Sequence, residues 1–141
     1  MQNLSPEYLG ELARQIAFVS VFLGGCAAAI MIQVLTSRSD ARVAGLVSGA
    51  AALAASALAL TALSAIMLTV TVHPQAPSNL ATPAVLLRAR VVTTLSFLVG
   101  VYAFLFAVGA SGWIRSRRMG VFTVIVASVA ALLISWAVSG F

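Results

Sequence analysis

Long parts of this 141-residue chain contain no charged side chain at all. Charged residues make up 8% of the sequence, against roughly 25% in an ordinary soluble domain. Lysine is absent, so arginine supplies every basic side chain, and the chain has one histidine, His73, and one cysteine, Cys26. A single cysteine excludes an internal disulfide and leaves the redox compartment undetermined.

The missing charges also leave few groups that could perform catalysis. Hydrolytic and transfer enzymes need a nucleophile beside a base, paired carboxylates or a metal cluster. The long uncharged stretches contain no Asp, Glu or His, and no phosphate-binding or zinc-protease motif is present. We therefore expect no enzymatic activity, no cofactor and no metal site. A clustered basic face is also missing, so we expect no nucleic-acid partner.

The sequence does contain four long apolar runs, at residues 15–37, 43–72, 91–114 and 119–141. Each run is long enough to cross the ~30 Å hydrocarbon core of a bilayer as a helix. We therefore predict an all-α integral membrane protein with four transmembrane helices in a single domain, 1–141, surrounded by membrane lipids. Arginine without lysine, together with many alanines, is typical of GC-rich bacterial genomes, so we expect a bacterial cytoplasmic (inner) membrane.

The residues before the first run predict an amphipathic arm that extends the first helix. Glu11, Arg14 and Gln15 recur at three- and four-residue steps, with leucines on another face. The combined helix, Pro6–Thr36, would be about 46 Å long. In the second loop, prolines disfavour helix in the residues before them, so we expect the third helix to begin only near Arg90.

The second run consists mostly of small residues. Gly45 and Gly49 are spaced as in motifs that let helices approach closely in lipid. We therefore expect the second helix to pack centrally. Four short helices with such faces bury little surface by themselves, so we also expect a homo-oligomer.

One face of the first run carries a pattern that bears on function. Its residues recur at three- and four-residue steps and change from aromatic through small to polar: Phe18, Phe22, Gly25, Ala29 and Gln33. An amide in hydrocarbon is costly unless it is hydrogen-bonded or hydrated. Gln33 could bond to another helix while the rest of the face only packs. Alternatively, symmetry copies of this helix could line an ion pore, with Gln33 at one mouth and a hydrophobic constriction at Phe18 and Phe22.

The segment 23–34, LGGCAAAIMIQV, resembles the pore helix of the Orai family of four-span calcium channels. Gln33 falls where that family places its selectivity glutamate. By the same register, pore-lining positions of the family match Ala29, Cys26 or Gly25, Phe22 and Phe18. Segments 64–74 and 96–113 are similar to parts of the family's second and third helices. The resemblance implies an oligomeric channel with a pore-lining first helix. It does not imply calcium selectivity, because Gln33 replaces the carboxylate.

Two other functions also fit the sequence. The lack of charge inside the apolar runs fits a non-conducting accessory, assembly or regulatory subunit of a larger membrane complex, which would have a partner protein. The aromatic residues of the third run fit a carrier of lipids or small apolar molecules. They are Phe97, Tyr102, Phe104 and Phe106.

Overall fold

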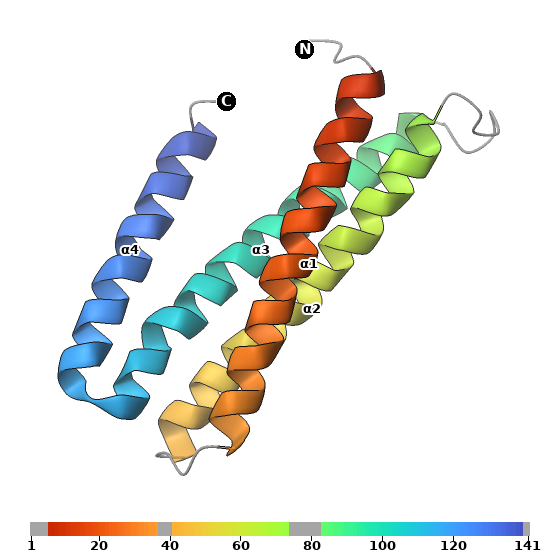
Figure 1. Cartoon of the computed structure of the whole chain (residues 1–141). Coiled ribbons are helices and arrows are strands. Elements are labelled where there is room, and N and C mark those ends of the chain that lie inside the picture. The colour runs from red at the N-terminus through yellow and green to blue at the C-terminus, as the bar shows by residue number, and fades with distance from the viewer. Residues whose placement is uncertain (1–5, 37–40, 74–82, 140–141) are drawn as a thin grey trace.

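The computed structural model describes residues 6–36, 41–73 and 83–139, and these residues form four α-helices and no strand (Figure 1). The helices are α1 (Pro6–Thr36), α2 (Ala41–Val72), α3 (Pro83–Arg115) and α4 (Arg117–Ser139). All four are long and apolar enough to cross a membrane. The prediction of an all-helical chain with four such helices is confirmed. The first helix also has the predicted bounds, including its arm.

The third helix begins earlier than predicted. Its first residue is Pro83, so the expectation that residues up to Arg90 form a loop was wrong. Proline suits the first turn of a helix, where its missing N–H would have no intrahelical partner. The early start places Leu86 and Ala89 of α3 against a small core cluster at the end of the bundle, formed by Ala13, Ala65 and Leu68. The remainder of that loop, 74–82, and the first loop, 37–40, lie outside the described residues.

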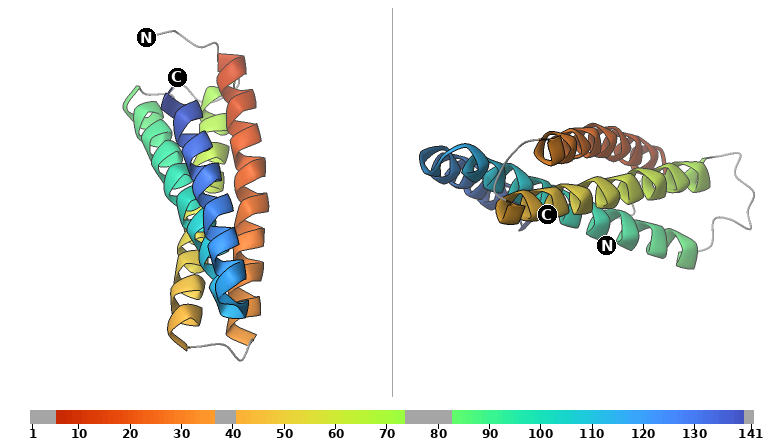
Figure 2. Two further views of the ribbon diagram at one scale, coloured as in Figure 1. Left: turned by 90° about the vertical axis from the view of Figure 1, so that its left-hand side faces the viewer. Right: turned by 90° about the horizontal axis from the view of Figure 1, so that it is seen from below.

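The helices run antiparallel, and α2 lies between α1 and α3 (Figures 1 and 2). Helix α1 contacts α3 only lightly. Among the described helices, α4 packs on α3 alone, and it stands apart from α1 and α2 at the edge of the molecule. As a result α2 is the most buried of the four helices and α4 the least buried.

The contact between α1 and α2 is a continuous seam of small side chains. On α1, every seventh residue is buried, at Ala13, Ser20, Ala27 and Val34. On α2, Ala62 is buried together with a series of residues that alternates at steps of four and three: Val47, Ala51, Ala54, Leu58, Thr61, Ala65 and Leu68. This spacing is typical of helices that pack side by side as in coiled coils and antiparallel bundles.

Leu58 fills the centre of the three-helix layer. Its side chain is fully buried between two glycines, Gly24 of α1 and Gly100 of α3. A Cβ atom added at Gly100 would lie 2.7 Å from Leu58 Cγ, and one at Gly24 would lie 3.5 Å from Leu58 Cβ. The two glycines therefore provide the space into which this leucine packs.

Buried hydroxyl groups lie in the same layer. Thr93 Oγ1 of α3 donates a hydrogen bond to Ser64 Oγ of α2 at 2.9 Å, and Ser64 donates to the Thr61 carbonyl at 3.0 Å. Ser20 differs, because its Oγ atom is fully buried and has no hydrogen-bond partner among the described residues. A hydrogen bond between hydroxyl groups thus adds to the apolar packing of α2 on α3.

Helices α3 and α4 are joined by a tight turn at Ser116, whose Oγ atom accepts a hydrogen bond from the Met119 N–H at 3.2 Å. Beside the turn, Thr123 Oγ1 donates to the Gly109 carbonyl at 2.8 Å. A Cβ atom at Gly112 would contact Thr123 Oγ1 and would lie 2.7 Å from the Met119 carbonyl oxygen. Glycine is therefore required where the two helices meet.

Candidate functional site

The five residues predicted to line a pore lie on the face of α1 that points away from α2, and all five are exposed. Phe18 is 75% exposed and Phe22 is 66% exposed. A Cβ atom added at Gly25 would meet nothing within 4 Å. We call this face, made of Phe18, Phe22, Gly25, Ala29 and Gln33, the outer column. The outer column and the seam occupy opposite sides of one helix.

The side chain of Gln33 has no hydrogen-bond partner among the described residues. Only its backbone carbonyl accepts a bond, from Thr36 Oγ1 at 3.1 Å. The sequence left two interpretations of Gln33 open. The first, a hydrogen bond from its side chain to another helix of the same chain, is not formed with any described helix. An amide in an apolar environment needs a partner, and none of the described residues supplies one to the Gln33 side chain.

The outer column continues into the polar arm that precedes it in the sequence. This continuation was not among the predictions from the sequence. Glu11, Arg14 and Gln15 line a shallow surface pocket together with Phe18 and Val19. Arg14 Nη1 lies 3.3 Å from Glu11 Oε2 in an exposed ion pair. The signal was present in the sequence, since the steps of three and four residues continue without a break from Glu11 to Phe18. The complete face is thus polar, then aromatic, then small, and polar again at Gln33.

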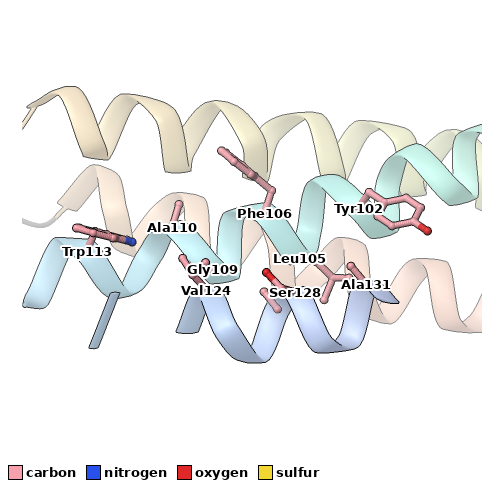
Figure 3. A pocket seen from close by; sticks show the side chains of 10 residues that line it. Tyr102, Leu105, Phe106, Gly109, Ala110, Trp113, Val124, Ser128 and Ala131 are labelled. Carbon is pink, nitrogen blue, oxygen red and sulfur yellow. The ribbon is translucent and has the colours of Figure 1, made fainter. Parts of the chain in front are cut away.

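An apolar groove of about 410 Å³ lies between α3 and α4 (Figure 3). Trp113 lies at one end of it and Tyr102 at the other, where the Tyr102 hydroxyl is 2.6 Å from Ser135 Oγ. Of the aromatic residues considered for a carrier, Tyr102 and Phe106 line this groove, whereas Phe97 and Phe104 do not. The lining residues are Tyr102, Leu105, Phe106, Gly109, Ala110, Trp113, Val124, Ala127, Ser128 and Ala131.

A second groove, of about 650 Å³, lies between α2 and α3. Gly45 and Gly49 line it, both are exposed, and a Cβ atom at either would meet nothing within 4 Å. The expectation that these glycines bring helices into close contact was therefore wrong for the single chain. They lie off the buried face of α2, which continues from Val47 to Ala51. Tyr102 and Phe106 line both grooves.

Within the described part of the chain, no three His, Cys, Asp or Glu side chains come together as metal ligands would. The absence of a metal or cofactor stays a prediction. No family model, curated protein or solved structure matches this chain. The oligomeric channel that the resemblance to the Orai family implies therefore also stays a prediction from the sequence.

Proposed function

We propose that this chain is an integral membrane protein of a bacterial inner membrane that assembles into a homo-oligomer and conducts ions. In this assembly the outer columns of several α1 helices surround a central pore. The observation that carries the proposal is the position of Gln33, on the face of α1 that no other described helix covers. A water-filled lumen satisfies this amide, and symmetry gathers copies of it into a polar ring.

The packing order of the helices fits such a pore. Helix α2 supports α1 from the side opposite the outer column, α3 lies behind α2, and α4 lies outermost. The lumen would pass from Glu11 and Arg14 at one mouth, through rings of Phe18 and Phe22, to Gln33 at the other. Hydrophobic constrictions can close a pore by dewetting, so the phenylalanine rings are the proposed gate. No fixed charge lies between Arg14 and Gln33, which supports a pore with weak ion selectivity.

Cysteine accessibility tests the proposal. In a Cys26→Ser background, Ala29→Cys and Gln33→Cys should react with a membrane-impermeant thiol reagent in intact vesicles. Leu132→Cys, on the exposed apolar face of α4, is the lipid-facing control and should not react. Ion flux through proteoliposomes should fall when the cysteines at 29 and 33 are modified. Protection at both positions would overturn the pore.

The alternative is a non-conducting subunit of a larger membrane complex, in which a partner protein covers the outer column. In this alternative the partner protein, rather than water, bonds the Gln33 side chain. Purification in mild detergent distinguishes them. A homogeneous homo-oligomer supports the pore, and stoichiometric recovery of a second protein that shields Gln33→Cys supports the subunit.

A further inference from the structure

The two apolar grooves form one trough. Helix α3 is its floor, α2 is one wall and α4 is the other, because Tyr102 and Phe106 of α3 line both grooves. The trough stays open because α4 packs on α3 alone among the described helices. The trough is independent of the outer column, since none of the residues that line it belongs to α1.

The trough is divided lengthwise into two channels. Tyr102 and Phe106 separate the α2–α3 groove from the α3–α4 groove, and the bond between Tyr102 and Ser135 at 2.6 Å fixes one end of this ridge to α4. On the α2 side, Gly45 and Gly49 leave the channel wide. The channels overlap along α3 at Tyr102 and Phe106, and their volumes of about 410 and 650 Å³ give room for the two acyl chains of one lipid.

Helices α2 and α4 begin at the same end of the bundle (Figure 1), and an arginine lies at or next to the first residue of each, Arg42 and Arg117. Arg117 precedes the groove-lining residues Val124, Ser128 and Ala131 at helical spacing, which places it on the same face of α4. Arg42 precedes Leu46 and Gly49 on α2 in the same way. Both arginines are exposed.

The charge at this end favours an anionic ligand. Three exposed arginines lie at the described starts of α2 and α4, namely Arg42, Arg117 and Arg118. The described parts of α2, α3 and α4 contain no Asp or Glu. The groove end beside them is occupied by Trp113, and tryptophan favours the headgroup level of a bilayer. Basic pockets between transmembrane helices bind anionic lipid headgroups.

We propose that the trough binds one two-chain anionic phospholipid. One acyl chain lies in each channel, on either side of Tyr102 and Phe106, and the phosphate lies between Arg42 and Arg117. This lipid site does not depend on whether the outer column conducts ions. A neutral phospholipid would fill the same channels but would lack the attraction to the two arginines.

Fluorescence quenching of Trp113 tests the proposal. The chain has two tryptophans, so Trp136→Phe leaves Trp113 as the only emitter. The protein is reconstituted in phosphatidylcholine vesicles that contain a small, fixed fraction of lipid brominated on its acyl chains, either phosphatidylglycerol or phosphatidylcholine. Brominated phosphatidylglycerol should quench Trp113 more strongly, with an apparent enrichment of about fivefold for each arginine in contact.

Matched variants locate the headgroup and the chains. Arg117→Gln and Arg42→Gln should each reduce the enrichment about fivefold, whereas Arg88→Gln, at the opposite end of the bundle, should leave it unchanged. Gly49→Leu should fill the α2 channel and reduce the enrichment, because its side chain enters open space. Ala59→Leu, exposed on α2 and outside the trough, is its control.

Three results would overturn the proposal. Equal quenching by the two brominated lipids would show that the trough does not select an anionic headgroup. Absence of quenching by either lipid would show that protein, such as a second copy of the chain, covers the trough. Enrichment that survives both arginine substitutions would place the headgroup elsewhere.

Discussion

The two helix pairs of this chain are joined in contrasting ways. Helices α1 and α2 touch along a continuous seam in which alanine recurs and a single leucine, Leu58, fills the space left by glycine. Helices α3 and α4 also approach closely, at Gly109 and Gly112, and a bond joins Tyr102 to Ser135 farther along, but an apolar groove runs along their contact. Small residues therefore bring both pairs together, and the pairs differ because α2 is covered on two sides whereas, among the described helices, α4 is covered by α3 alone.

The largest expected effect comes from breaking the seam. Leu58→Ala removes the side chain that fills the space between Gly24 and Gly100, and the cavity should lower the free energy of unfolding by about 2–4 kcal/mol. The measurement is unfolding of the purified protein by titration with a denaturing detergent. Leu63→Ala, a change of the same size at an exposed position of α2, should cost far less. Equal losses would show that the seam does not control stability.

Breaking the α3–α4 junction should have the next largest effect. Gly112→Val places a side chain against Thr123 and the Met119 carbonyl, and overpacking of this kind costs about 1–3 kcal/mol. The same detergent titration measures the loss. The matched control is Gly45→Val, where the added side chain enters open space. If both valine variants unfold alike, the junction is looser than its geometry indicates.

The hydrogen bonds between helices should contribute less. Tyr102→Phe removes the bond to Ser135 and Thr93→Val removes the bond to Ser64, and each should cost about 0.6 kcal/mol, as interhelical bonds in membranes do on average. A second measurement distinguishes the two variants, because only Tyr102→Phe should loosen the packing of α4 on α3. Proteolysis of α4 should therefore rise in Tyr102→Phe and stay unchanged in Thr93→Val; a rise in both would contradict the separate roles.

The smallest effect is expected at Ser20, where the substitution should stabilise the protein rather than destabilise it. A buried hydroxyl without a partner is unfavourable, so Ser20→Ala should raise the free energy of unfolding by up to about 1 kcal/mol. In the same titration, Thr93→Val removes a hydroxyl that does have a partner, so it should lower the free energy of unfolding. A loss of stability in Ser20→Ala would indicate that the buried Ser20 hydroxyl bonds an internal water.

Hydropathy and helical spacing predicted much of this arrangement. The bounds of α1 and the shared face of the outer column follow from charge-free length and from steps of three and four residues. Two features were not predictable in this way. Pro83 could be read as ending a loop or as starting a helix, and the packing of Leu86 and Ala89 against the core cluster of Ala13, Ala65 and Leu68 favours the helix.

The open side of α4 was the second unpredictable feature. In a soluble protein an apolar face indicates a packed one, but in a membrane protein lipid-facing and packed faces are equally apolar. The composition of α4 therefore could not reveal that it contacts α3 alone. For the same reason the spacing of Gly45 and Gly49 could not show whether these glycines contact a helix or line a groove.

The opposite placement of the seam and the outer column on α1 also affects how this protein can change over generations. Ala27 and Ala29 are two residues apart in the sequence, yet one is fully buried and the other is exposed. A mutation at the first alters whether the chain folds, and a mutation at the second leaves folding of the single chain untouched. In the proposed pore, selection can therefore change the outer column almost independently of the scaffold.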